Sequence, residues 1–152
     1  MNARASSGCP SGSLRRVTEA NSCRLAKQRT RNTAPEVALR RALYAAGERY
    51  RVDYPPLPEL RRRRADIVFP KVRVAVFVDG CFWHGCPQHG SVPKSNRAWW
   101  AAKLEANRVR DTQTNNALTR RGWIVLRFWE HCDPFTSAVE IANVVRQRRR
   151  GA

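Results

Sequence analysis

Two cysteines and two histidines lie within nine residues, in the stretch CFWHGCPQH that begins at Cys81. Cys81, Cys86 and His89 have the spacing C-x4-C-x2-H, and thiolate with imidazole favours Zn²⁺ over Mg²⁺. A closed tetrahedral site needs a fourth ligand, which His131 or Cys132 can supply from later in the chain. Because this spacing is not that of a common zinc finger, the alternative is buried cysteines beside solvated histidines.

Acidic residues earlier in the chain are the second candidate for chemistry. Asp66 lies in an apolar segment directly after four arginines, and Asp79 ends a second apolar segment. With Glu36 they offer the oxygen ligands that Mg²⁺ requires, and His84 can take a proton from an attacking water. This set of residues indicates metal-assisted phosphodiester hydrolysis. Taken alone, Asp66 is also explained by an ion pair with an arginine of residues 61–64.

Large aromatic residues lie beside the candidate zinc ligands. Phe82 and Trp83 fall between the two cysteines, and Trp99 and Trp100 form a second pair. Ligands on both sides of Phe82 and Trp83 are expected to hold these rings at the surface of a loop, where an aromatic side chain can enter a DNA base stack. The alternative is that the rings are core residues. We expect at least one pair to be buried and at least one ring to reach DNA.

The overall charge favours a polyanionic partner. The 152 residues include 29 Lys+Arg against 12 Asp+Glu, which gives a formal net charge of +17. Such a surface binds nucleic acid in a salt-dependent way, because each neutralised phosphate releases counterions. A genome whose base composition favours arginine codons is the alternative source of this charge.

The composition also indicates where the protein works. With 42% hydrophobic residues and five tryptophans, the chain is expected to fold. No stretch approaches the roughly 20 apolar residues of a membrane span, and the N-terminus lacks the apolar core of a secretory signal. Five cysteines is an odd number for a disulfide scaffold. We therefore expect a cytoplasmic protein with reduced thiols or a metal site.

The pattern along the chain predicts one folded α/β domain over residues 25–152, after a flexible basic arm at 1–24. Strands are predicted at 49–54, 65–69, 72–78 and 123–129. Three helices are predicted. The first runs from Thr33 to Gly47 and starts with the capping-box spacing of Thr33 and Glu36, with Pro35 in its first turn. The second covers 97–121 after Asn96, and the third runs from Thr136 or Ser137 to the arginines at 148–150.

These features together resemble the very-short-patch repair endonucleases, bacterial enzymes that nick DNA at T:G mismatches left by deamination of 5-methylcytosine. The likeness runs from about residue 20 to the end of the chain, and the GCFWH block after an apolar strand is highly specific. The matching stretches are RTRNTAPE at 29–36, ADIVF at 65–69, VFVDGCFWHGC at 76–86, NRVRD at 107–111 and GWIVLRFWEH at 122–131.

The resemblance implies a restriction-endonuclease-like fold, a central mixed sheet flanked by helices, with a catalytic Mg²⁺ and a structural Zn²⁺. It implies that Asp66 and the main-chain carbonyl of Val78 bind Mg²⁺ and that His84 is the general base. Glu36 would lie in the outer shell of the metal or orient the histidine. Asp111 would support the site from the long helix.

The resemblance also assigns the zinc ligands and the residues that enter DNA. The implied zinc ligands are Cys81, Cys86, His89 and His131. The implied intercalating residues are Phe82, Trp83, Trp100 and Leu25, the last standing where the family's N-terminal arm usually carries a methionine. Asp79 is a departure, since the family commonly has a histidine there, and it is expected to bind the metal or to tune it.

The implied partner is double-stranded DNA with a T:G mismatch, acted on by a monomer associated with the bacterial nucleoid. Mismatch-repair proteins and a DNA cytosine methyltransferase that acts at the same sites are further expected partners. Two other functions fit the residues. One is a restriction-type nuclease without mismatch preference, and the other is a zinc-braced module that binds DNA or RNA without catalysis.

Overall fold

The computed structural model describes residues 31–90 and 92–151, so the expected arm at 1–24 and Leu25 lie outside the described residues. The elements follow the predicted order of helix, three strands, helix, strand and helix. They are α2 (Ala34–Ala45), β1 (Arg51–Tyr54), β2 (Ala65–Phe69), β3 (Val74–Asp79), α3 (Arg97–Arg120), β4 (Ile124–Trp129) and α4 (Pro134–Arg150). None of the helices in the described ranges has the length and apolarity needed to cross a membrane.

The four strands form one mixed sheet in the order β1-β2-β3-β4. β2 is antiparallel to both β1 and β3, whereas β3 and β4 are parallel and are joined through α3. In the antiparallel pair, Asp66 near the start of β2 lies beside the end of β3. In the parallel pair, Asp79 at the end of β3 is opposite Trp129 at the end of β4. One end of the sheet therefore collects residues from distant parts of the chain.

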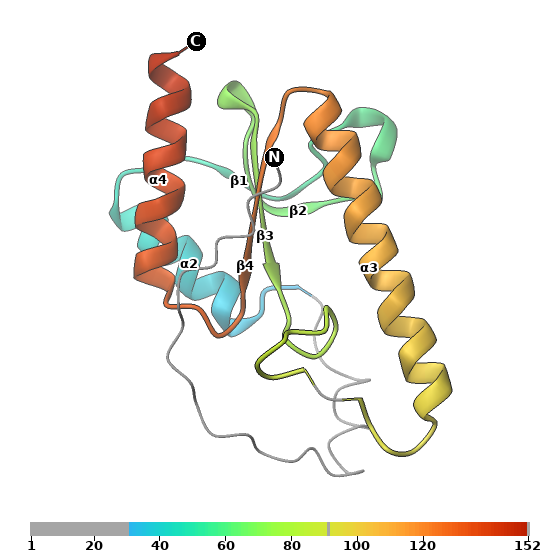
Figure 1. The fold of residues 1–152 in the computed structure, drawn as a ribbon. Helices are drawn as coiled ribbons and strands as arrows, with labels where there is room; N and C mark the ends of the chain where they lie inside the picture. Colours follow the sequence, from blue (N-terminus) through green and yellow to red (C-terminus); the bar gives the residue numbers. More distant parts are fainter. Residues whose placement is uncertain (1–30, 91, 152) are drawn as a thin grey trace.

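Helices cover both faces of this sheet, with α2 and α4 on one side and α3 on the other (Figure 1). Successive strand residues point to opposite faces, so each strand contributes to two cores. Ile67 packs in the core with Leu43 of α2 and Ile141 of α4. Val68, the next residue, packs in the second core with Leu118 of α3. Burial on both faces explains why the central strands are almost wholly apolar and confirms the expected restriction-endonuclease-like α/β architecture.

Strand boundaries differ from the prediction where local turns intervene. The third strand begins at Val74 and not at residue 72, because Pro70–Val72 form a short 3₁₀ turn. Arg73 then takes a left-handed conformation, with φ 55°. The other two shortened strands begin at Arg51 and Ile124.

The start of the last helix differs from the prediction, whereas the first helix starts after Thr33 as predicted but without the predicted capping box. The last helix begins at Pro134, two or three residues earlier than expected, because the carboxylate of Asp133 caps the helix by accepting the backbone N–H of Thr136. At the first helix, Thr33 occupies the cap position without accepting a hydrogen bond from the helix. Its hydroxyl instead donates to Glu36, whose other oxygen accepts the N–H of Asn32.

Candidate active site and metal cluster

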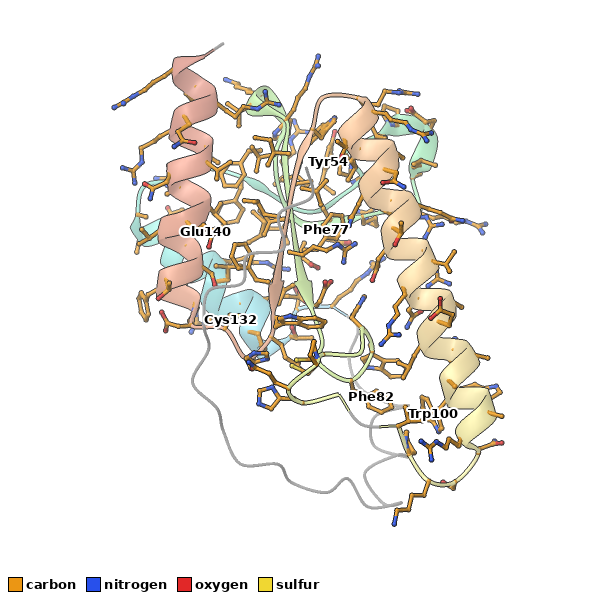
Figure 2. All side chains as sticks on the ribbon, in the orientation of Figure 1. Tyr54, Phe77, Phe82, Trp100, Cys132 and Glu140 are labelled. Carbon is orange, nitrogen blue, oxygen red and sulfur yellow. The ribbon has the colours of Figure 1, made fainter. Side chains whose placement is uncertain are left out.

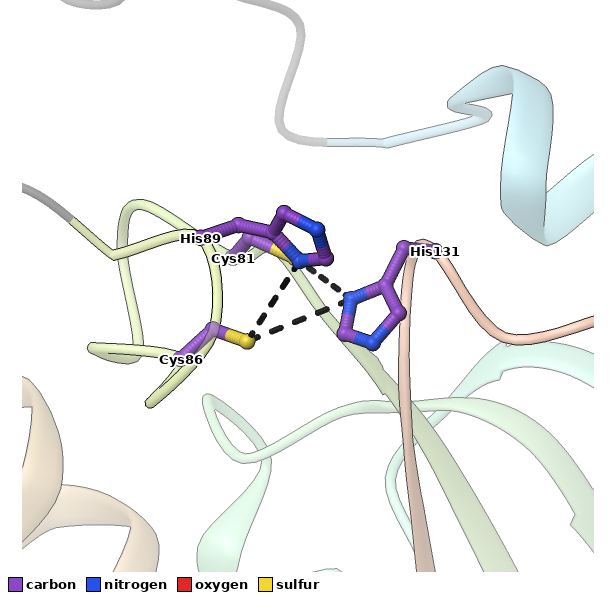
Figure 3. Close-up of side chains that lie close together, drawn as sticks. All are labelled: Cys81, Cys86, His89 and His131. Carbon is purple, nitrogen blue, oxygen red and sulfur yellow. Dashed lines mark hydrogen bonds between the residues drawn. The ribbon is translucent and has the colours of Figure 1, made fainter. Parts of the chain in front are cut away.

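The four residues expected to bind zinc lie together after β3 and β4 (Figure 3). The Sγ of Cys81 is 3.0 Å from Nδ1 of His131, and the Sγ of Cys86 is 3.9 Å from Nδ1 of His89 and 4.0 Å from that of His131. One donor atom from each residue falls within 4.8 Å of the others. His131, and not its neighbour Cys132, is the fourth member of this group.

The environment of the cluster suits a metal that binds sulfur and nitrogen. Burial and the neighbouring Cys86 raise the pKa of the Cys81 thiol, while burial and His89 lower the pKa of His131. The thiol of Cys81 and the imidazole of His131 thus favour their neutral forms, and they face Cys86 and His89 in a small volume. A divalent metal would stabilise the thiolates and take up the nitrogen lone pairs, so the donor set fits Zn²⁺.

Backbone hydrogen bonds hold the loop that carries these ligands. The carboxylate of Glu130 accepts the N–H of Cys81 at 2.8 Å, which ties the loop to the end of β4. Within the loop, the carbonyl of Cys81 accepts the N–H of Cys86 at 2.9 Å, and the carbonyl of Gly80 accepts the N–H of His84 at 3.1 Å. Glu130 is a site residue that was not predicted from the sequence, although it follows β4 directly and precedes His131.

Asp66 is the central candidate for the active site. Its Oδ2 accepts the backbone N–H of Val78 at 2.7 Å, which brings the two expected magnesium ligands together. Burial raises the pKa of Asp66 to about 7, the Val78 hydrogen bond opposes this, and the charges of Glu36 and Asp79 add to it. No arginine in residues 31–90 or 92–151 forms an ion pair with Asp66, and Arg64 pairs with Asp53 instead. The ion-pair alternative is therefore wrong within the described residues.

His84 is held by an acid from α3. Its Nδ1 lies 2.6 Å from Oδ2 of Asp111 and 3.8 Å from Oδ1 of Asp79. Burial opposes protonation of His84, but the hydrogen bond to Asp111 and the charge of Asp79 outweigh it, so the pKa of His84 is above its ordinary value. Against the effect of burial, His84 and Arg127 lower the pKa of Asp111. A proton on Nδ1 donates to Asp111, which leaves the Nε2 lone pair available as a base.

Glu36 does not orient His84, which was one of its two expected roles. Its side chain is buried and accepts hydrogen bonds from Asn32, Thr33 and Arg40. The acid that contacts the histidine is Asp111. Glu36 nevertheless lies close enough to Asp66 for its charge to raise the pKa of that carboxyl. The other expected role, a place near the metal, stays a prediction.

Arg127, in the middle of β4, is the main site residue that the sequence analysis missed. Its guanidinium group donates to Asp79 at 2.6 Å, to Asn115 at 3.0 Å and to Asp111 at 3.3 Å. The group also stacks on the ring of Phe77, with its central carbon 4.5 Å from the ring centroid. Arg127 is the one charged residue in the otherwise apolar strand at residues 124–129, and this feature of the sequence could have identified it as a site residue.

The aromatic residues form a cluster and do not project from a loop. The ring of Phe82 lies 5.2 Å from those of Trp83 and Trp100, and those two tryptophan rings are 5.9 Å apart. Phe82 and Trp100 lie near each other beside the start of α3 (Figure 2). Both are buried, Trp83 is half-buried, and Trp99 is 53% exposed. The expectation that Phe82 lies at the surface is wrong, because edge-to-face packing lets the rings shield one another. Asn107 of α3 fixes the loop by donating to the carbonyl of Trp83.

Comparisons with known proteins agree with this arrangement. Residues 17–89 match the family described as DNA mismatch endonuclease Vsr. The type II nicking enzyme V.NaeI of Lentzea aerocolonigenes is 48% identical over 124 residues, which cover 81% of this chain and 75% of that protein. The type II nicking enzyme V.XorIIP of Xanthomonas oryzae pv. oryzae is 44% identical over 67% of this chain and 73% of its own length. The DNA mismatch endonuclease Vsr of Escherichia coli is 35% identical over 66% of this chain and 63% of its own length.

Proposed function

Because the chain belongs to the Vsr family of DNA mismatch endonucleases, we propose that it nicks one strand of double-stranded DNA at T:G mismatches by Mg²⁺-dependent hydrolysis. Family membership makes it an endodeoxyribonuclease. The observation that carries the finer proposal is the carboxylate of Asp66, which has no ion pair with residues 31–90 or 92–151 and lies at the same end of the sheet as the His84–Asp111 pair. A module that only bound DNA would need neither group.

In this proposal, Asp66 and the carbonyl of Val78 bind Mg²⁺, and Glu36 adds negative charge in its outer shell. When bound, Mg²⁺ stabilises the charge that develops on the phosphate oxygens. His84 accepts a proton from the attacking water at Nε2, since Asp111 occupies Nδ1. Asp111 also stabilises the imidazolium that results, which is why an acid that contacts the base assists the reaction.

The second metal in the proposal is structural. Zn²⁺ bound by Cys81, Cys86, His89 and His131 would join the loop after β3 to the end of β4. The same loop carries His84 and two of the aromatic residues. Zinc would thus maintain the position of the base and of the rings without taking part in hydrolysis.

Cleavage of labelled duplexes tests the proposed function. We expect nicking of one strand of a T:G duplex in Mg²⁺, no nicking after chelation by EDTA, and no nicking of the matched C:G duplex. Equal cleavage of matched and mismatched duplexes in one sequence context would instead identify a restriction-type nuclease. Tight binding without any cleavage would identify a non-catalytic module.

The aromatic cluster is proposed to recognise the mismatch by entering the base stack. Trp83 is the most accessible of its three rings, and Phe82 and Trp100 would follow when DNA separates them. Trp83→Ala is expected to lower the ratio of T:G to C:G nicking by roughly 10-fold or more, because intercalation offsets an unstacking cost of a few kcal/mol. DNA affinity measured without Mg²⁺ should change by less than about threefold.

Trp99→Ala is the matched control, because Trp99 is exposed and, within the part of the chain that the structure describes, its ring contacts only that of Trp100. It should leave the T:G to C:G ratio unchanged. If Trp83→Ala lowers affinity and discrimination equally, the ring serves packing and the recognition role is lost.

The remaining expectations extend this proposal to the cell. We propose that residues 25–152 act as one nuclease domain and as a monomer in the bacterial cytoplasm. The T:G mismatches would arise at the sites of a DNA cytosine methyltransferase, with mismatch-repair proteins as partners.

A further inference from the structure

The side chain of Arg127 is almost inaccessible to solvent, at 5% exposed, yet it carries a full positive charge inside the sheet. An isolated charge in such a place is strongly unfavourable unless acids and hydrogen bonds compensate it. Its guanidinium group donates hydrogen bonds to Asp79, Asn115 and Asp111, and Phe77 covers one face. Because the guanidinium group is buried and already donates to these three residues, it does not reach the surface where it could contact a DNA phosphate. Its effect on the reaction must pass through its neighbours.

Those neighbours surround His84. The carboxylates of Asp79 and Asp111 both face Nδ1 of His84, at 3.8 and 2.6 Å. Among the arginines and lysines that the structure describes, Arg127 alone forms ion pairs with both acids. Without a shared cation, two like charges close to one ring would repel each other and turn apart. The guanidinium fork also suits this bridge, because its donors diverge in a fixed plane. The bridge therefore defines where the oxygen of Asp111 meets the histidine.

We propose that Arg127 is a positioning residue of the active site, which neutralises Asp79 and holds Asp111 in the orientation that directs Nε2 of His84 toward the scissile phosphate. Asp79 is then the counter-ion of Arg127 and not a metal ligand, because Oδ1 of Asp79 accepts a charged hydrogen bond of 2.6 Å. This proposal rests on the proposed function only in naming His84 as the base.

Single-turnover nicking of a T:G duplex by paired variants tests the proposal. Arg127→Met keeps the length of the side chain but leaves Asp79 unpaired, and it should slow nicking by about 100-fold through misplacement of the base. The affinity for DNA should change by less than about threefold, so the loss falls on the rate and not on binding. The double variant Asp79→Asn/Arg127→Met removes both charges and should recover to within roughly tenfold of the wild-type rate.

Two further variants test the shape of the guanidinium group and the effect of removing an arginine elsewhere. Arg127→Lys keeps the charge but not the fork, and its rate should lie between those of the wild type and Arg127→Met. Arg121→Met removes an exposed arginine that pairs with Glu59 at the surface, and it should nick at the wild-type rate. Thermal melting of each variant measures whether the fold is retained, and the double variant contains no unpaired buried charge at positions 79 and 127.

Nuclear magnetic resonance of the His84 ring gives a readout that does not depend on activity. Long-range proton–nitrogen correlations should show the neutral wild-type ring protonated at Nδ1, and Arg127→Met should shift the tautomer population toward Nε2. Any one of three results would overturn the proposal. They are nicking by Arg127→Met at the wild-type rate, nicking by the double variant no faster than by Arg127→Met, and a tautomer population that Arg127→Met leaves unchanged. Failure of the wild type to nick in Mg²⁺ would refute the proposed function, and the tautomer measurement would still decide the role of Arg127.

Discussion

Asp66→Asn is expected to abolish nicking and, at the same time, to stabilise the metal-free protein. Asparagine keeps an oxygen that can accept the N–H of Val78, so the contact at 2.7 Å survives. It lacks the negative charge that is proposed to bind Mg²⁺, and loss of several kcal/mol of transition-state stabilisation should lower the nicking rate by at least about 1,000-fold. A residue that is needed for activity but unfavourable for the fold is typical of an active site.

The effect on stability follows from the pKa of Asp66, which burial raises from 3.8 to about 7. Between these values the unfolded chain is ionised while the folded protein keeps its proton. The contribution of Asp66 to stability is therefore fully present below pH 3.8, declines as the pH rises toward 7, and is lost above that. At pH 8 we expect Asp66→Asn to raise the free energy of unfolding by on the order of 2–4 kcal/mol.

Urea denaturation of metal-free protein at pH 5 and pH 8 measures this effect, which should be larger at pH 8. Mg²⁺ should raise the melting temperature of the wild type but not of Asp66→Asn, because only the carboxylate binds the ion. Asp53→Asn is the matched control on β1, where the carboxylate pairs with Arg31 and Arg64 at the surface. It should retain nicking and gain no stability. Activity of Asp66→Asn above a tenth of the wild-type value would refute the metal assignment.

Cys86→Ser is expected to release zinc and to cause the largest loss of stability among the predicted variants. Serine cannot supply the thiolate, so the loop after β3 would lose the metal-mediated link to His131 at the end of β4 and keep only the hydrogen bond to Glu130. The free energy of unfolding should fall by about 4 kcal/mol or more, the range that accompanies loss of a structural metal. For a chain of this size the melting temperature should drop by roughly 10 °C. Nicking should be lost as well, because the same loop carries His84.

Cys132→Ser is the matched control, since Cys132 lies next to His131 in the chain but outside the four-residue cluster. Elemental analysis of purified protein should find about one zinc per chain in the wild type and in Cys132→Ser, and almost none in Cys86→Ser. Loss of zinc from Cys132→Ser would show that the fourth ligand is Cys132 and not His131. A zinc-free wild type of unchanged stability would remove the structural role of the metal.

Much of the fold could be predicted from the sequence because the signals are local. Strand β2 has the predicted bounds, since an apolar run between Arg64 and Pro70 permits little else. The start of the last helix could not be placed as well. Thr136 and Ser137 are both good capping residues, and the competing cap at Asp133 became clear only from its hydrogen bond to the Thr136 N–H.

The aromatic residues show a different limit. The stretch around Phe82 and Trp83 indicated a special loop, but residue types do not determine whether a ring is exposed. Trp100 comes from α3, and its contact with Phe82 buries both rings. Exposure depends on how that helix packs against the loop, which is a property of the whole fold.

The sequence by itself predicted which chemical groups this protein can use. These are thiols and imidazoles at metal-binding spacing, and acids at the ends of apolar strands. Donor groups a few residues apart in the chain can be predicted to share a site, because a few residues of backbone span only a short distance. The pairing of distant groups was decided by the tertiary structure alone. His84 meets Asp111 across 27 residues, Asp79 meets Arg127 across 48, and Cys81 meets His131 across 50. Strand order and the crossover through α3 bring these groups within bonding distance, and no local pattern encodes that geometry.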